Sequence, residues 1–369
     1  MSALKRQQGL TLVELMIATA LSLTLLAGVL LVFSANKATY NLQNGLSVLQ
    51  ENGRYAIQQI ASDIQLAGYG GCISPRVSPA PRIINLVSTN APKTDFLDGF
   101  PDQTFFQGRN DETGKYHDYD DAGTEMDIGP DFDGDGNRGD QGTDSLQIRG
   151  PLDRKLDYVS GAVITSGTVD VQGFSDTFEV GDYVAISDCA GVDIFAVSGV
   201  GGGGTTLAHA AGGATNSQAN LSRGFGLDAT VSKLVSRTYF VADTGRDNSS
   251  GQDIIALYRE DEDPATPAVE LVDGVEDFQV EYGLDTDLDG EIDAFRNGPG
   301  APTMVATDWP NVVAIRVSLL LSSIEAASAT SAPYTWFPVQ NTPITPAAGD
   351  LRVRQEFSAL ISVRNGILE

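Results

Sequence analysis

Two short stretches of alternating aspartates are the parts of this sequence best suited to hold a metal ion. Alternate carboxylates in a tight turn direct their oxygens to one point, and a glycine permits the sharp bend, as in EF-hand calcium loops. We therefore expect at least one stretch to bind calcium. The candidate ligands are Asp131, Asp133, Asp135 and Asn137 around Gly136 in the first loop, and Asp285, Asp287, Asp289, Glu291 and Asp293 around Gly290 in the second.

Both loops depart from the EF-hand pattern at its twelfth position. That position holds Gly142 in the first loop and Arg296 in the second, where a bidentate Glu belongs. Asp140 or Asp144 could replace the missing oxygens in the first loop, and Asp293 in the second. The alternative is two solvated acidic turns, which Asp and Gly favour in any case.

Other catalytic chemistry is sparse. The only histidines, His117 and His209, stand in an acidic loop and a Gly/Ala loop, and we expect both at the surface. No nucleophile elbow, P-loop or dinucleotide fingerprint occurs. A carboxylate pair of the glycosidase kind stays open as an alternative, because acids are abundant. We therefore predict that the protein is not an enzyme.

Composition limits the partners. The 369 residues contain 49 acids and 23 bases, a formal net charge of −26, which argues against nucleic acid as a partner. The length suits one large domain or two ordinary ones. Two cysteines rule out a zinc finger but allow one disulfide.

The N-terminus is a short basic segment followed by an apolar run. Lys5 and Arg6 precede a stretch that is apolar from Leu10 to Phe33, and residues 15–33 carry no charge. About 20 such residues span a bilayer as a helix. The basic residues predict a cytoplasmic N-terminus, with the rest of the chain outside. An ordinary signal peptide or anchor is the alternative, although its apolar core is shorter and ends in a small-residue cleavage site.

Glu14 interrupts this apolar segment. A carboxylate in hydrocarbon costs roughly 2.5–3.5 kcal/mol on insertion scales, so such a residue indicates function unless it lies among the lipid headgroups. The segment Gly9–Leu15, G-L-T-L-V-E-L, resembles the processing site of type IV prepilins. The resemblance implies that a prepilin peptidase cleaves between Gly9 and Leu10 and methylates the new N-terminus of Leu10. It also implies that Glu14 of one subunit neutralises the ammonium of a neighbour inside an apolar helical bundle, where an unpaired charge is costly.

The helix is expected to continue to Ala67. Leu42, Leu46, Leu49, Ile57, Ile60 and Ile64 recur at three- and four-residue steps, with Gly53 in the gap. The polar residues off this stripe are Gln43, Gln50, Glu51, Arg54, Gln58 and Asp63. Gly68–Gly71 contains the glycines that end such a helix. We thus expect a leader at 1–9, a transmembrane or filament-core helix at 10–33, its amphipathic continuation at 34–67, and a β-rich globular domain at 68–369.

The globular domain is predicted to be antiparallel β-sheet, so that the fold class is α+β, with one long N-terminal helix packed on the sheet. The acidic residues 95–144 and the Gly-rich residues 198–224 are expected to be long loops. Runs rich in Val, Ile, Phe and Tyr predict the strands at Ser145–Arg149, Tyr158–Val171, Tyr183–Ser187, Ile194–Val197, Val231–Val241, Ile254–Tyr258, Phe278–Tyr282, Val312–Leu321 and Leu351–Val363.

Several of these segments resemble one family. They are Gly68–Cys72, Val180–Val197, Leu271–Gly290, Asp308–Leu321 and Arg354–Asn365, and together they resemble the PilW family of type IV pilus minor pilins. The resemblance implies a subunit that is held in the inner membrane before assembly and then enters the extracellular pilus near its tip. Its implied partners are other pilins and minor pilins, the prepilin peptidase and a tip adhesin, with roles in pilus biogenesis, adhesion or twitching motility. The alternatives are a pseudopilin of a type II secretion system and a surface-anchored, calcium-binding adhesin module.

Cys72 and Cys189 are expected to form a disulfide. Export places both residues in an oxidising compartment, and a bond would join the end of the helix to the sheet. The alternative is two separate buried thiols.

Overall fold

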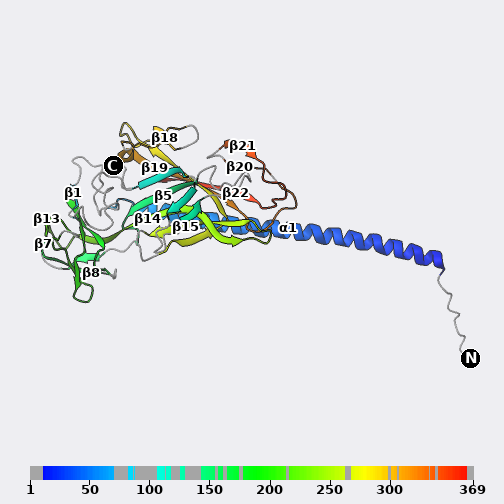
Figure 1. Cartoon of the computed structure of the whole chain (residues 1–369), viewed down its shortest axis with the longest axis horizontal. Coiled ribbons are helices and arrows are strands. Elements are labelled where there is room, and N and C mark those ends of the chain that lie inside the picture. The colour runs from blue at the N-terminus through cyan, green and yellow to red at the C-terminus, as the bar shows by residue number, and fades with distance from the viewer. Residues whose placement is uncertain are drawn as a thin grey trace, which may run out of the picture.

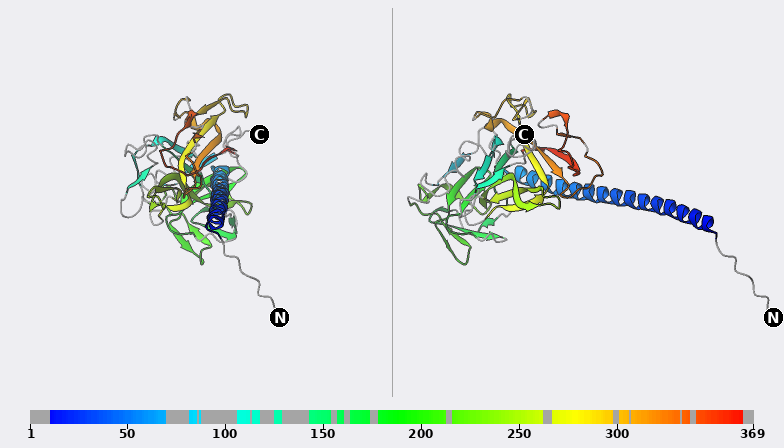
Figure 2. Two further views of the ribbon diagram at one scale, coloured as in Figure 1. Left: turned by 90° about the vertical axis from the view of Figure 1, so that its right-hand side faces the viewer. Right: turned by 45° about the vertical axis from the view of Figure 1, so that its right-hand side comes forward.

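The protein was analysed as a computed structural model. The structure describes residues 11–69, 82–85, 87, 106–112, 114–117, 125–128, 143–153, 157–160, 164–173, 178–212, 216–261, 267–297, 301–305, 307–331, 333–336 and 340–363. A long helix projects from a β-rich body in all three ribbon views (Figures 1 and 2). The fold is therefore α+β, as predicted.

The helix α1 spans Leu12–Leu66, and both of its ends are fixed by local chemistry. At the start, Thr11 and Glu14 form a capping box, in which the side chain of each residue bonds the backbone N–H of the other. At the end, Gly68 adopts a φ of 63°, in the left-handed region that glycine tolerates. These caps place the helix close to the predicted range.

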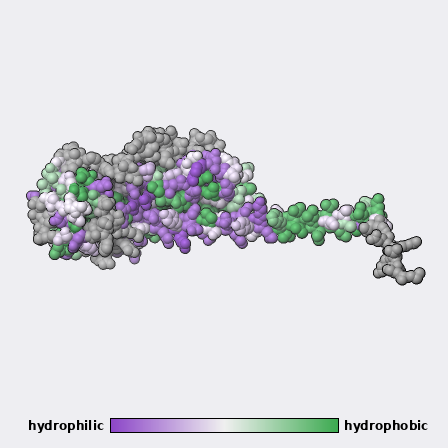
Figure 3. Space-filling view, turned by 90° about the horizontal axis from the view of Figure 1, so that it is seen from below, coloured by the Kyte–Doolittle hydropathy of each residue, from purple (hydrophilic) through white to green (hydrophobic). Residues whose placement is uncertain are grey.

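The two halves of α1 have different surroundings. It is the one helix, in the part of the chain that the structure describes, that is long and apolar enough to cross a membrane, and its most apolar stretch is wholly exposed. Figure 3 shows this bare half as a mostly hydrophobic rod. The other half packs on the sheets through a stripe of buried residues at three- and four-residue steps: Leu49, Gly53, Ala56, Ile60, Asp63 and Ile64.

Gly53 is the position where α1 lies closest to a strand. A Cβ built on Gly53 would stand 2.5 Å from ring atoms of Phe357, which belongs to strand β22. Any side chain at Gly53 would therefore push the helix off the sheet. The gap in the predicted apolar stripe is thus the position where the ring of Phe357 packs against the helix.

The described strands form one sheet of 14 strands, one of four and two of two. The four-stranded sheet has the order β18-β17-β19-β22 and is antiparallel throughout. The strands are β1 Arg82–Asn85, β2 Phe106–Glu112, β3 Gly114–His117, β4 Glu125–Ile128, β5 Thr143–Gly150, β6 Asp157–Val159, β7 Ile164–Ser166, β8 Thr168–Gly173, β9 Tyr183–Asp188, β10 Gly191–Ala196, β11 Gly199–Gly201, β12 Thr206–Ala208, β13 Asn220–Phe225, β14 Thr230–Asp247, β15 Asp253–Asp261, β16 Val269–Asp273, β17 Val275–Leu284, β18 Ala294–Arg296, β19 Val312–Ser322, β20 Tyr334–Trp336, β21 Gln340–Ile344 and β22 Arg354–Ser362; a short 3-10 helix, Trp309–Asn311, precedes β19.

Two large hydrophobic cores lie in the described part of the body, besides a small cluster of Phe240, Ala242, Ala256 and Tyr258. The larger contains the buried half of α1, the four-stranded sheet and part of the large sheet. The smaller is formed between residues 159 and 231 by side chains such as Phe195, Phe225 and Val231, and we call residues 157–231 the distal lobe. In Figure 1 its strands β7, β8 and β13 lie beyond the C-terminal end of α1, at the pole opposite the bare half of the helix. Strand β14 belongs to both parts, because it pairs with β9 in the lobe and with β5 and β15 nearer the helix.

Three predictions about the loops and the sheet were wrong. The acidic segment 95–144 contains β2, β3 and β4, and the Gly-rich segment 198–224 contains β11, β12 and β13. The predicted strand Tyr158–Val171 is three strands, β6, β7 and β8. Backbone pairing with neighbouring strands overrides the weak local propensity of acidic and Gly-rich sequence.

His209 is buried rather than exposed. The residue has 0% relative exposure, and its ring packs 5.2 Å from the ring of Phe195. Burial lowers the pKa of His209. The neutral imidazole therefore acts as a core side chain of the distal lobe.

A buried carboxylate links strand β17 to the β20–β21 hairpin. Asp277 accepts hydrogen bonds from Nε1 of Trp336 (2.6 Å) and from Nε2 of Gln279 (3.0 Å). Burial raises the pKa of Asp277 to about 7, although both hydrogen bonds favour the ionised form. The hairpin is therefore anchored by a group that titrates near neutral pH.

We expect this group to make stability depend on pH. Between about pH 4 and pH 7 the folded chain keeps the Asp277 proton while the unfolded chain has lost it, so the free energy of unfolding falls as pH rises, by up to about 4 kcal/mol. Asp277→Asn should remove that fall, whereas Asp228→Asn, at an exposed residue, should leave it. Denaturant unfolding of the detergent-solubilised chain at pH 4, 5.5, 7 and 8 measures the difference. The prediction would be contradicted if the free energy of unfolding fell equally with pH in the wild type and in Asp277→Asn.

Candidate functional site

The bare half of α1 is the first candidate site, because a long apolar surface needs a partner. Side chains such as Leu12, Leu25 and Leu31 are 73–75% exposed. Glu14 lies near its end, where Oε2 accepts hydrogen bonds from the backbone N–H and the hydroxyl of Thr11, both at 2.9 Å. The carboxylate is thus held at the end of the apolar rod. Gly9 and Leu10 lie outside the described residues.

The opposite end of α1 is fastened by a buried ionic cluster. Asp63 accepts a 2.6 Å hydrogen bond from the hydroxyl of Tyr239 and lies 3.5 Å from the guanidinium of Arg237. Arg237 also pairs with Asp153 and, at 2.8 Å, with Asp261. Burial raises the pKa of Asp63, and the bond from Tyr239 and the charge of Arg237 oppose that rise. The position of Asp63 off the buried stripe was wrongly predicted.

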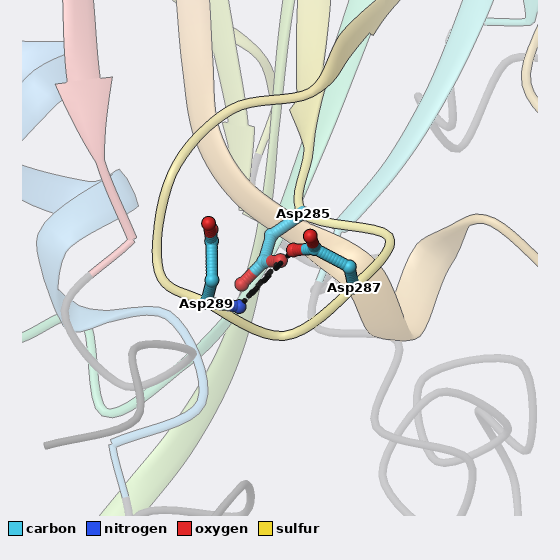
Figure 4. A group of neighbouring side chains, drawn as sticks. All are labelled: Asp285, Asp287 and Asp289. Atoms are coloured by element: carbon cyan, nitrogen blue, oxygen red, sulfur yellow. Dashed lines mark hydrogen bonds between the residues drawn. The ribbon is translucent and has the colours of Figure 1, made fainter.

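The second acidic loop brings three carboxylates together. Asp285, Asp287 and Asp289 each offer an oxygen within 4.8 Å of the others (Figure 4). Asp285 is buried and accepts hydrogen bonds from the backbone N–H groups of Leu288, Asp289 and Gly290. Leu288 and Gly290 both have positive φ, 64° and 91°, which gives the turn its tight bend. This triple-aspartate group, in which Asp287 and Asp289 are exposed, could bind a metal ion.

Electrostatics of this loop favour a cation. The pKa of Asp287 is raised, first by desolvation and then by the charges of Asp289 and Asp293. Asp293 has its pKa lowered by hydrogen bonds from the hydroxyl and the backbone N–H of Thr286. The carboxylate of Asp293 therefore already accepts hydrogen bonds from within its own loop. Glu291 is exposed.

The remaining predicted site residues are placed as follows. Asp131, Asp133, Asp135, Asn137 and Asp140 lie outside the described residues, as does Cys72. Asp144 is buried and accepts from the backbone N–H of Val280 at 2.7 Å, so its carboxylate supports β17. Cys189 lies exposed in the turn between β9 and β10.

Two features of the site were missed in the sequence. Thr11 and Glu14 have the T-x-x-E spacing of a capping box, which could have been recognised. Asp63 follows Ile60 by three residues and so falls on the helical stripe, which is the signal that it is buried. No signal pointed to Arg237, because its partners come from three separate segments, around Asp63, Asp153 and Asp261.

A long helix with a bare apolar half and a buried half on antiparallel sheet defines a pilin-like protein. Residues 4–30 match the family model described as the prokaryotic N-terminal methylation motif, and residues 238–365 match that of type IV pilus-assembly protein W, PilW. Over residues 238–365 the chain matches the PilW family of type IV pilus-assembly proteins, and together with its prepilin N-terminal motif it has the features of a minor pilin. This is a non-enzymatic assembly family. No curated protein matches the chain.

Proposed function

We propose that the chain is made as a prepilin, cleaved between Gly9 and Leu10, methylated at Leu10 and inserted into the pilus through α1. Residues 1–9 are then the leader, 10–33 the membrane and filament-core helix, 34–67 its amphipathic continuation and 68–369 the globular domain. The N-terminus is cytoplasmic until assembly. The bare apolar half of α1 supports this proposal, since it needs the bilayer first and neighbouring helices afterwards.

The subunit occupies a position near the pilus tip. The distal lobe extends past the C-terminal end of α1 (Figure 1), into the space where a subunit stacked above would place its own domain. A subunit at the tip has no neighbour there. From this position the chain primes assembly with other minor pilins, and loss of it reduces piliation, twitching motility and adhesion.

The tip position is tested by locating the chain in intact pili. A short epitope can replace part of the β11–β12 turn at Gly203, where an added Cβ meets nothing within 4 Å. Immunogold labelling should mark one end of each filament. Label along the whole filament would contradict the tip position. Label in no filament, together with a secretion defect on deletion of the chain, would support the pseudopilin alternative.

A second proposal is that the Asp285–Asp293 loop binds calcium. The observation that favours it is the cluster of three aspartate oxygens on a turn with positive φ at Leu288 and Gly290. A divalent cation relieves the repulsion among these carboxylates and adds binding energy to the folded state alone. It also orders the connection between β17 and β18, which are neighbouring strands of the four-stranded sheet.

We expect millimolar calcium to raise the melting temperature of the detergent-solubilised chain, and chelator to reverse the rise. Asp287→Ala removes an exposed ligand without touching the hydrogen bonds of Asp285, so it should reduce the rise. Asp228→Ala, at an exposed acid outside the loop, is the matched control. Calorimetry with no heat of binding would leave the loop as a plain acidic turn. An unchanged rise in Asp287→Ala would assign calcium to the Asp131–Asn137 loop.

We also propose the disulfide between Cys72 and Cys189. In the part of the chain that the structure describes no cysteine is free, which supports the bond. The bond would close a long loop from the end of α1 to the β9–β10 turn, worth about 4–5 kcal/mol in the chain-entropy model. Thiol labelling of the unfolded, non-reduced chain should find no free thiol, and labelling after reduction should find two. Two free thiols before reduction would show separate cysteines.

A further inference from the structure

Strand β22 is an outer strand of the four-stranded sheet, and no described strand pairs with its other side. Its register with β19 is continuous over nine residue pairs, without a bulge. Its last six residues, Phe357–Ser362, contain no charge and no proline. We call these six residues the β22 edge. Such an edge is a template on which another chain can add a strand.

The register shows which backbone groups face outward. The N–H of Val363 donates to the carbonyl of Val313 at 2.9 Å, so that pair is a hydrogen-bonded one. Bonded and non-bonded pairs alternate in an antiparallel ladder, and the bonded pairs therefore continue at Ile361 and Ala359. It follows that Ser358, Leu360 and Ser362 turn their N–H and C=O groups away from β19. All three are exposed, Leu360 by 52%.

The other outer strands in the described parts of the sheets are protected. Strands β1, β3, β7, β11, β18 and β20 have only three or four residues. Strand β2 contains Arg109 and Glu112 and a break in register between them. Strand β16 carries Glu270 and Asp273, β13 is irregular, and β21 contains Pro343. Short length, charge, bulges and proline are the features that keep edges from pairing. The β22 edge lacks all four.

The position of the edge indicates what pairs with it. Strand β22 packs on α1 through Phe357 and Gly53, and in Figures 1 and 2 it lies on the side of the body from which the bare half of α1 emerges. In a filament all α1 helices point the same way, so neighbouring subunits meet through different surfaces, head to tail. The edge therefore faces the neighbour that stands on the membrane side.

We propose that the β22 edge binds an extended segment of the neighbouring pilin subunit by β-strand addition. The inference rests on the proposed function as a pilus subunit. Main-chain hydrogen bonds to Ser358, Leu360 and Ser362 give the affinity. The side chains of the edge are uncharged, so a neutral strand can bind there although the protein as a whole is acidic.

Photo-crosslinking in the native cell tests the proposal on the full chain. A photoreactive amino acid at Ser362 should give an adduct with a different pilin that carries the N-terminal methylation motif, identified by mass spectrometry. The same probe at Val269, on the charged β16 edge, is the matched control. A probe at Ile17, on the bare half of α1, reports assembly by itself. Adducts from Ile17 but none from Ser362 above the control would overturn the edge inference and leave the function intact, whereas no pilin adducts from either site would overturn the function.

Variants at Leu360 separate backbone pairing from side-chain contact. The N–H of Leu360 points outward, so Leu360→Pro blocks the added strand without removing a bond to β19. It should reduce the Ser362 adduct at least about tenfold, while Leu360→Ala should leave it unchanged. Leu360→Lys, which keeps the backbone donor but adds an edge charge, should also reduce the adduct and covers the case in which the proline variant fails to fold. An adduct that survives both Pro and Lys, or one formed only between two copies of this chain, would overturn strand addition from a neighbouring pilin.

Discussion

Replacing Gly9 by leucine is expected to leave the chain uncleaved and absent from pili. Glycine lets the peptidase approach the backbone before the scissile bond, and a side chain there blocks that approach. Intact mass of the membrane-extracted chain should show that the nine-residue leader is retained. Gln7→Leu, which introduces the same leucine side chain two residues earlier, should be cleaved normally. A normal mature mass for Gly9→Leu would contradict the prepilin assignment.

Glu14 is expected to act after cleavage. Glu14→Ala should be processed but should enter pili poorly, because a neighbour's N-terminal ammonium is left unpaired. The structure gives Glu14 a second role as part of the capping box with Thr11, and glutamine also serves in such a box. Glu14→Gln therefore separates the two roles. Poor assembly of both variants supports the charge, while recovery in Glu14→Gln would assign the defect to the cap.

The largest loss of stability is expected from Arg237→Met. The change leaves Asp63 buried with Tyr239 as its remaining partner and removes the cation that Asp153 and Asp261 share. Breaking a buried ion pair by removing one partner costs about 3–5 kcal/mol. Denaturant unfolding of the detergent-solubilised chain gives the value.

A control on the same strand shows whether burial is the cause. Arg246 also lies on β14 and pairs with Glu270 and Asp273, but its side chain is 50% exposed. Arg246→Met should cost less than about 1 kcal/mol, as exposed pairs do. Adding Asp63→Leu to Arg237→Met should recover part of the loss, because no buried charge is then left unpaired. Equal losses for the two arginine variants would contradict a buried role for Arg237.

The helix and three strands of the four-stranded sheet, β17, β19 and β22, could be predicted from the sequence because their patterns are local. The apolar run, the T-x-x-E cap and the glycine at residue 68 fix α1, and runs such as Val312–Leu321 are strands by composition. The Asp285–Asp289 group was likewise visible in its spacing.

What the sequence did not reveal depends on contacts between distant residues. Strands β2 to β4 and β11 to β13 exist because neighbours pair with them, and their acidic or Gly-rich composition hides them. His209 is buried because the distal lobe folds around it, which its Gly/Ala surroundings do not indicate. The cluster at Asp63 joins residues up to about 200 positions apart, so no local pattern could identify it.

Strand β14 has a mechanical consequence for a subunit that lies near the pilus tip, as we propose for this chain. It runs without interruption for 18 residues from the distal lobe to the part of the body that holds α1. Tension applied to the lobe is carried into the body along this strand, whose hydrogen bonds to β9, β5 and β15 are perpendicular to it and bear the load together. Such a ladder breaks only when many hydrogen bonds are sheared at the same time. The lobe is therefore not separated from the rest of the body by the loss of one strand after another.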